Sequence, residues 1–227
     1  MKKFNQLYET IRLIIRRKYM HLTAKQRKKT IDMDDFTIIS NNCWGGFIYQ
    51  SYGIKYNTPT IGCFFMAKDY IKFISNIKHY LKQSLKYIDS SSSKWYPLIK
   101  DKPDFNTYPI GKLDDIEIHF LHYSSFEEAF NKWENRLKRI NYEKIIYKFS
   151  EMNDCDEADI LSFQKLDIPN KICFISSKYK KLKNDFTIVL SQKEVTASHE
   201  PFGNSRLINI NHFLNEINKK GEQKWLQ

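Results

Sequence analysis

The stretch from residue 35 to residue 50 constrains the fold more than any other part of this 227-residue chain. It begins with an apolar, β-branched run at 36–39, passes through a polar loop and the glycine pair Gly45-Gly46, and resumes from Phe47 with helical spacing. This order predicts a strand, a sharp turn and a helix. Ligands of α/β proteins most often bind beyond the carboxyl end of a strand and against a helix N-terminus. We therefore expect the active-site loop here.

Strands and helices alternate along most of the chain. Apolar runs predict strands at 56–65, 116–122, 144–150, 171–176 and 186–190, and helical spacing is found at 69–87, 126–137, 154–166 and 213–220. The alternation predicts a three-layer α/β fold, with a Rossmann-like mixed or parallel sheet and helices on both faces. We expect a basic amphipathic helix at 1–29 and an α/β transferase-like domain at 30–227, with a subdomain boundary near 90–107 as an open alternative.

The positive charge is concentrated in the first residues. The whole chain carries +11, and residues 2–29 hold ten Lys or Arg against one acid, Glu9. Apolar residues recur in this segment at steps of three and four. Such a helix either binds an anionic membrane surface or docks on the domain with its basic face in water. The remaining residues are nearly neutral, so nucleic acid is not an expected partner.

The four cysteines, Cys43, Cys63, Cys155 and Cys173, have no zinc-binding spacing. Cys63 and Cys173 lie in apolar runs and fit small core residues of a reducing compartment. No secretory signal and no run long enough to span a bilayer is seen in the sequence. We expect a cytoplasmic protein that is peripheral at the inner face of the plasma membrane.

The loop after the first strand allows three interpretations. As a binding site, Ser40, Asn41, Asn42 and the freed backbone N–H groups of Gly45 and Gly46 suit a diphosphate or a sugar hydroxyl. As a catalytic site, Cys43 at a helix N-terminus should have its thiolate favoured and, with a His as base, form a covalent intermediate. In the third, the glycines only permit close packing of helix on strand. We favour a ligand-binding role.

The stretch 111–123 supplies the candidate base. His119 and His122 are an odd number of residues apart, so they point to opposite faces unless His122 already lies in the loop. His122 is the better candidate for a general base, with Asp115 or Glu117 orienting it, and a hydrogen-bonded structural role is the alternative. Whether the two carboxylates reach the loop depends on the direction of this strand, which the sequence leaves open.

Two further patterns resemble ligand sites. Asp154-Cys155-Asp156 has the spacing by which metal-dependent glycosyltransferases hold a cation, but acidic residues at a helix start are ordinarily N-caps, and we favour the cap. Arg136 and Arg139 lie one turn apart and can clamp a phosphate, although such pairs are more often solvated. We therefore predict no metal site here and do not expect a divalent cation, although the sequence leaves the metal requirement of the reaction open.

Several of these motifs resemble one known family. Residues 40–46 (Ser-Asn-Asn-Cys-Trp-Gly-Gly), 108–123 (including Asp-Asp-Ile-Glu-Ile-His-Phe-Leu-His-Tyr) and 133–141 are similar to a bacterial exopolysaccharide-biosynthesis family catalogued as a domain of unknown function. The family usually has Val where this chain has Ile110. The resemblance covers about residues 35–190 and implies an α/β fold and a role in capsule, lipopolysaccharide or exopolysaccharide assembly, without an established reaction.

The expected function is a transferase, most plausibly a glycosyltransferase from an activated sugar donor such as a nucleotide-sugar to a lipid-linked saccharide. A Cys/His-dependent acyltransferase or hydrolase acting on the same glycans is the first alternative. A non-catalytic polysaccharide-assembly protein is the second. The candidate catalytic residues are Cys43, His122 and Asp115. The candidate substrate-binding residues are Ser40, Asn41, Asn42, Gly45, Gly46, Glu117, His119, Arg136 and Arg139.

Overall fold

A computed structural model describes residues 2–217 of the chain and, from residue 7 onward, their side chains. Four strands form a parallel sheet in the order β1-β5-β6-β7. These strands span Thr37–Ser40, Ile145–Ser150, Lys171–Ile175 and Thr187–Val189. Three of the four fall within the predicted apolar runs, because buried parallel strands require nearly continuous apolar sequence, and β1 extends one residue beyond its run, to Ser40.

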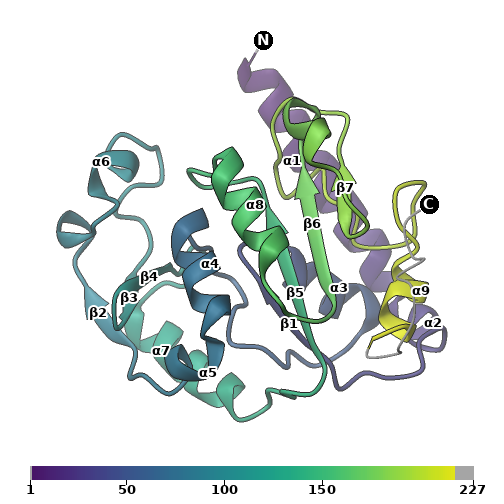
Figure 1. Cartoon of the computed structure of the whole chain (residues 1–227), viewed down its shortest axis with the longest axis horizontal. Coiled ribbons are helices and arrows are strands. Elements are labelled where there is room, and N and C mark those ends of the chain that lie inside the picture. Colours follow the sequence, from purple (N-terminus) through teal and green to yellow (C-terminus); the bar gives the residue numbers. More distant parts are fainter. Residues whose placement is uncertain (1, 218–227) are drawn as a thin grey trace.

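Helices cover both faces of this sheet, which confirms the three-layer α/β fold (Figure 1). One face packs against α4 (Ala67–Ser75) and α8 (Glu157–Lys165). The other packs against α3 (Trp44–Tyr52) and α9 (Ile210–Asn215). Ile38 and Ile39 illustrate the alternation, since these neighbours on β1 enter different cores.

A second, smaller sheet lies beside the first and is antiparallel, in the order β2-β3-β4 (Figure 1). Its strands span Lys86–Ile88, Ile110–Leu113 and Ile116–His119. α7 (Phe126–Leu137) follows it, and Ser125 caps this helix by accepting a hydrogen bond from the Glu128 N–H at 3.2 Å. The short elements between β2 and β3 are η1 (Ser90–Ser92) and α6 (Tyr96–Ile99). The described residues therefore form two separate sheets, a parallel one and an antiparallel one.

Two predicted elements are wrong. Residues 56–65 form no strand and only one isolated bridge, between Phe64 and His119. Thr58 and Thr60 bond to each other there, at 3.0 Å between hydroxyl oxygens, and such local bonds replace a ladder. The helix predicted at 69–87 ends as α4 and a single turn, α5 (Ile77–Tyr80), because Asn76 has a non-helical backbone (φ −141°). The strand β2 then occupies its last residues.

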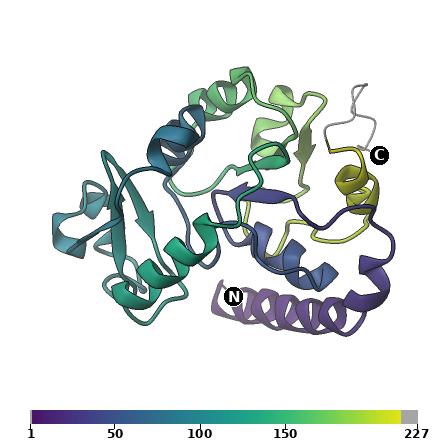
Figure 2. The same ribbon diagram turned by 90° about the horizontal axis from the view of Figure 1, so that it is seen from below.

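The N-terminal segment is helical, as predicted, in two pieces: α1 (Lys2–Leu22) and α2 (Ala24–Lys28). Both pack against α3, and α1 forms an outer edge of the molecule (Figure 2). A further short helix, η2 (Ser177–Leu182), follows β6. The predicted helix at 213–220 is represented by α9, and its last three residues lie outside the described part.

Candidate active site

Cys43 lies in the turn between strand β1 and helix α3. β1 ends at Ser40, and Cys43 occupies the N-cap position of α3. The Cys43 side chain makes no capping bond, so its sulfur stays available. The capping role falls to the neighbouring Asn42, whose Oδ1 accepts the Trp44 N–H at 3.0 Å. The thiol is half-buried at the carboxyl end of the parallel sheet.

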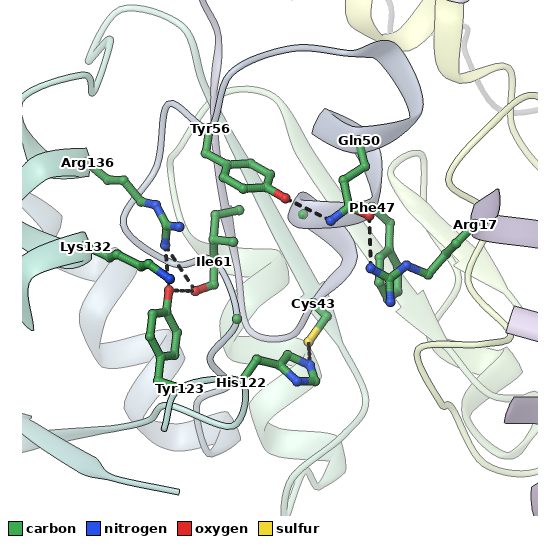
Figure 3. A pocket seen from close by; sticks show the side chains of 12 residues that line it. Arg17, Cys43, Phe47, Gln50, Tyr56, Ile61, His122, Tyr123, Lys132 and Arg136 are labelled. Atoms are coloured by element: carbon green, nitrogen blue, oxygen red, sulfur yellow. Dashed lines mark hydrogen bonds between the residues drawn. The ribbon is translucent and has the colours of Figure 1, made fainter. Parts of the chain in front are cut away.

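His122 lies directly against this thiol. Its Nε2 is 3.3 Å from Cys43 Sγ, although 79 residues separate the two in sequence. β4 ends at His119, so His122 belongs to the following turn, where its N–H donates to the Gly62 carbonyl at 3.0 Å. The alternation of side chains along a strand therefore does not constrain His122. Its side chain reaches Cys43, a contact that the sequence left uncertain (Figure 3).

Both partners are held in their neutral forms. Burial raises the pKa of the Cys43 thiol to about 11, and the nearby Glu200 carboxylate raises it further while Lys148 and Arg17 lower it. Burial, followed by the positive charge of Arg17, lowers the pKa of His122. The expectation that the helix N-terminus favours the thiolate is wrong, because burial outweighs it. At neutral pH the pair is a thiol beside a free imidazole, which is the arrangement of a nucleophile with its general base.

The pair opens into a cavity of about 270 Å³ between α3, α7 and the inner side of α1 (Figure 3). Its wall is formed by Arg17, Cys43, Gly46, Phe47, Gln50, Tyr56, Ile61, Gly62, His122, Tyr123, Lys132 and Arg136. The volume is slightly below the usual size of drug-sized ligand sites and suits a small group such as a phosphorylated headgroup or an acyl chain end.

Three cations and no carboxylate line this cavity. Arg136 is buried, and its Nη1 donates to the Tyr123 hydroxyl at 2.5 Å while its guanidinium lies 5.2 Å from the centre of the Tyr56 ring. Arg17 donates to Gln50 Oε1 at 3.0 Å. The charge of Lys132 is compensated, because Lys132 forms an ion pair at 2.5 Å with Glu128, which lies outside the cavity wall. The cavity is therefore electropositive and suited to an anion.

The polar residues before Cys43 build the loop and do not line the cavity. Asn41 bridges β1 and β5, with its Nδ2 donating to the Ser150 carbonyl at 2.9 Å and its Oδ1 accepting the Ser150 N–H at 3.0 Å. Ser40 donates to Asn42 Oδ1 at 3.2 Å. Ser40, Asn41 and Asn42 are all buried, so the structure gives these three predicted binding residues internal partners.

A buried ion pair completes this support. Lys148 on β5 and Glu200 in the loop before α9 are both fully buried, with Nζ 2.8 Å from Oε2. Lys148 also donates to Asn42 Oδ1 at 2.7 Å, and Asn42 Nδ2 donates to Glu200 Oε1 at 3.1 Å. Charges in a dry interior are tolerated only when paired and hydrogen-bonded, as here. The pair fixes the residue that caps α3, one position before the thiol.

The two glycines have different surroundings. A Cβ on Gly45 would lie 3.1 Å from Ile38 Cγ2, so Gly45 allows α3 to approach β1 closely. Gly46 lines the cavity, and a Cβ there would meet only the Ile61 side chain, at 3.7 Å. Backbone N–H groups in the first turn of a helix have no intrahelical acceptor. That of Gly46 is therefore the natural donor to a ligand oxygen.

Other predicted site residues lie elsewhere. Asp115, in the turn between β3 and β4, pairs with Lys72 and accepts from the Tyr80 hydroxyl at 2.9 Å, so it does not orient His122. Glu117 is buried and accepts the Lys94 N–H at 2.9 Å. Both carboxylates thus belong to the small sheet and its contacts with the α4–α5 region and the 93–94 loop, and not to the cavity.

His119 and Arg139 are also outside the cavity wall. His119 is buried and stacks on Phe64 with 4.6 Å between ring centres, and burial lowers its pKa to about 3. Neither of its ring nitrogens has a hydrogen-bond partner among residues 7–217. Arg139 is half-buried, and Arg136 alone of the predicted arginine pair reaches the cavity.

The sequence interpretation missed several cavity residues. Lys132 lies one helical turn before Arg136, and this spacing was a usable signal. Arg17 was counted only as one charge of the N-terminal segment. No local pattern points to the cavity residues Gln50 and Tyr56, because their positions depend on long-range packing. The same holds for Glu200, the counter-ion of Lys148, which lies behind the loop and not in the cavity wall.

The Asp154-Cys155-Asp156 motif is a helix cap, as favoured. Asp156 accepts the Asp159 N–H at 2.9 Å, and Asp159 returns the bond to the Asp156 N–H at 3.1 Å, which makes a reciprocal capping box. Within residues 2–217, no group of three or more His, Cys, Asp or Glu side chains is placed to hold a metal ion.

Fold and site together define a three-layer α/β protein with a Cys–His pair in an electropositive cavity beyond the end of its first strand. The family model for a domain of unknown function, DUF1919, matches residues 14–225, and the chain belongs to this family. An uncharacterized protein of Haemophilus influenzae is 27% identical over 187 residues, which cover 82% of this chain and 84% of that protein. No helix within the described residues is long and apolar enough to cross a membrane.

Proposed function

We propose that the cavity is the active site of a thiol-dependent transferase that acts on an anionic substrate in surface-polysaccharide biosynthesis. The contact of 3.3 Å between Cys43 Sγ and His122 Nε2 carries this proposal. It supports the Cys/His acyltransferase or hydrolase over the glycosyltransferase that the sequence favoured. The biosynthetic setting rests on the resemblance of the motifs at 40–46, 108–123 and 133–141 to an exopolysaccharide-biosynthesis family.

The proposed first step is acylation of the thiol. His122 takes the proton of Cys43 while Sγ attacks the donor carbonyl, and the first-turn N–H of Gly46 donates to the oxyanion that develops. The tetrahedral intermediate then collapses, the donor's leaving group accepts the proton from the imidazolium, and a thioester remains on Cys43. Arg17 and Arg136 hold the anionic part of the donor.

The second step regenerates the enzyme. An acceptor hydroxyl attacks the thioester carbonyl, His122 removes the hydroxyl proton, and the departing thiolate recovers that proton. The expected acceptor is a lipid-linked saccharide, with water as the acceptor if the enzyme is a hydrolase. An acceptor of this kind and the basic excess of residues 2–29 both support peripheral association with the inner face of the plasma membrane.

Mass spectrometry of the intact protein tests the covalent step. After incubation with acyl phosphates and acyl thioesters, we expect an acyl adduct on Cys43 that hydroxylamine removes. His122→Ala should slow its formation about 100-fold or more, as loss of a general base does. Cys155→Ser is the matched control, because this half-buried thiol lies outside the cavity and should not change the adduct. Absence of any adduct on Cys43 with every donor would contradict acyl transfer.

Glycosyl transfer is the second candidate, because cations without carboxylates beside a helix N-terminus also suit a nucleotide-sugar diphosphate. In that case Cys43 binds but does not react. Cys43→Ser would then keep turnover with a nucleotide-sugar, and calorimetry would detect the donor in wild type and variant alike. A non-catalytic assembly protein would instead keep polysaccharide production in cells carrying Cys43→Ser or His122→Ala.

A further inference from the structure

Helix α1 is docked with its apolar face turned outward. Seven of the twelve large apolar side chains that are exposed among residues 7–217 belong to this one helix: Leu7, Tyr8, Ile11, Ile14, Ile15, Tyr19 and Leu22. They recur at steps of three and four and so form a continuous stripe along it. A helix that only supported the domain would bury this stripe, and solvent would cover its polar side.

The inward side of α1 is made of arginines and a few apolar residues. Arg16 donates to the carbonyl oxygens of Ser198 at 3.2 Å and Glu200 at 2.9 Å, and its guanidinium stacks over Phe202 with 3.7 Å to the ring centre. Arg17 lies 5.0 Å from the centre of the Phe47 ring and reaches the cavity wall. The helix is therefore held to the fold through its charged side, and one of these charges belongs to the candidate active site.

The charges around the stripe identify what covers it. Lys18 lies within the stripe and is exposed, and Arg12 is exposed near its edge, where it pairs with Glu9 at 3.3 Å. The single acid of residues 2–29, Glu9, is turned inward, where it accepts a bond from Ser198 Oγ at 3.3 Å. A second copy of this helix would bring these cations against each other. An anionic bilayer satisfies both the apolar stripe and the cations, because lysine stems extend to the phosphates while apolar side chains enter the acyl boundary.

We propose that the outward face of α1 lies in the interface of an anionic bilayer, parallel to its surface. The described helix of 21 residues is about 30 Å long and is too polar to cross, so it lies flat. Arg17 of the same helix reaches the cavity wall, so this contact would bring the cavity close to the lipid phosphates. The bilayer contact stands without the proposed function. The further conclusion, that the cavity takes the phosphorylated headgroup of a membrane-anchored substrate, rests on the proposed function.

Vesicle co-sedimentation of the full chain tests the surface. We expect binding to vesicles with about one third phosphatidylglycerol and weak binding to pure phosphatidylcholine. The double variant Ile11→Asp/Ile15→Asp should lower the partition coefficient about tenfold or more. Leu98→Asp/Leu207→Asp is the matched control, since both leucines are exposed outside α1 and should have no effect. Equal loss in both pairs, or none in the first, would overturn the proposal.

Three further measurements separate the outcomes. Cys43→Ala should bind vesicles like the wild type, so loss of the chemistry and loss of the membrane contact are scored independently. Arg17→Gln should keep vesicle binding and weaken binding of inorganic pyrophosphate in solution. Light scattering without lipid distinguishes a second copy: a dimer that Ile11→Asp/Ile15→Asp converts to a monomer would assign the stripe to self-association and refute the bilayer contact. Circular dichroism of each variant checks that the chain is folded.

Discussion

The buried pair of Lys148 and Glu200 gives the most quantitative prediction. Replacing Lys148 by Met removes the cation and leaves the Glu200 carboxylate in a dry interior, with Asn42 Nδ2 and Ser150 Oγ as its remaining side-chain donors. Breaking a buried pair from one side costs about 3–5 kcal/mol. Since domains unfold with about 5–15 kcal/mol, the single variant should lose about a fifth or more of its stability.

The double variant Lys148→Met/Glu200→Met should be far less damaged than Lys148→Met. It removes both charges together, and Asn42 Oδ1 still accepts the Trp44 N–H, although Asn42 Nδ2 and Ser150 Oγ lose a partner. We expect it within about 2 kcal/mol of the wild type, which corresponds to those lost bonds. Burial also lowers the pKa of Lys148, so desolvation opposes the charged pair and favours this result.

Urea unfolding of the four proteins in this cycle measures the coupling energy directly. Asn42 Oδ1 still accepts the Trp44 N–H in both variants, so the acyl adduct on Cys43 should follow stability: it should fall in the single variant and be largely retained in the double variant. A single variant that costs less than about 1 kcal/mol, or a double variant whose loss equals the sum of the two single losses, would refute the assignment of a tightly coupled buried pair.

Three other substitutions test the site and its surroundings. His119→Phe removes two ring nitrogens that have no hydrogen-bond partner among residues 7–217. Because the pKa of His119 is about 3 in the folded protein and 6.5 in the unfolded chain, the free energy of unfolding of the wild type should fall by about 1.4 kcal/mol per pH unit below pH 6.5. Urea unfolding of the variant should show a weaker dependence on pH in this acid range. Arg17→Gln should raise the Kd of inorganic pyrophosphate about tenfold in calorimetry, since a charged donor is lost, with Arg12→Gln unchanged as the control. Gly62→Ala places a Cβ 2.9 Å from the Tyr123 ring at φ +73° and should cost about 1–3 kcal/mol, whereas Gly46→Ala, with only Ile61 at 3.7 Å, should leave stability nearly unchanged and instead reduce adduct formation at Cys43.

The pH dependence of acylation follows from His122. Burial, followed by the charge of Arg17, lowers the pKa of this imidazole, so the base form persists at pH values below the ordinary pKa of about 6.5. Adduct formation should therefore be constant through neutral pH and fall only at more acid pH than an ordinary imidazole would give. An acid limb that persists unchanged in His122→Gln, with the remaining slow rate, would assign the titration to another group.

Local pattern was enough to predict the four strands of the parallel sheet and most of the helices that pack on it. The strands around Ile146, Cys173 and Ile188 are buried on both faces, and such strands are recognisable in a sequence as continuous apolar runs. The small sheet was largely missed, because Lys86–Ile88 is a short edge strand with exposed side chains and resembles the helix before it. Ile110–Leu113 follows prolines and contains Gly111, which pattern analysis assigns to a turn.

The candidate site was predicted in its centre and in part of its wall, where Gly46 and Arg136 were expected but Arg17, Tyr56 and Lys132 were not. Cys43 and Gly46 follow from the strand–turn–helix pattern, and His122 from its place near a strand end. The polar residues Ser40, Asn41 and Asn42 were expected to bind substrate, but sequence does not reveal that Lys148 and Glu200 meet them inside the fold. The distinction between a polar residue that binds a ligand and one that satisfies the interior depends on partners more than 100 residues away.

Those distant partners have a consequence for how the protein is made. Asn42 and Glu200 are separated by 158 positions, so the buried network that supports the α3 cap cannot be completed until most of the chain has left the ribosome. Until then Lys148 has no counter-ion, and the half that emerges first, including the helix that carries Cys43, lacks its final support. The loop that carries Cys43 thus gains its supporting contacts late in synthesis.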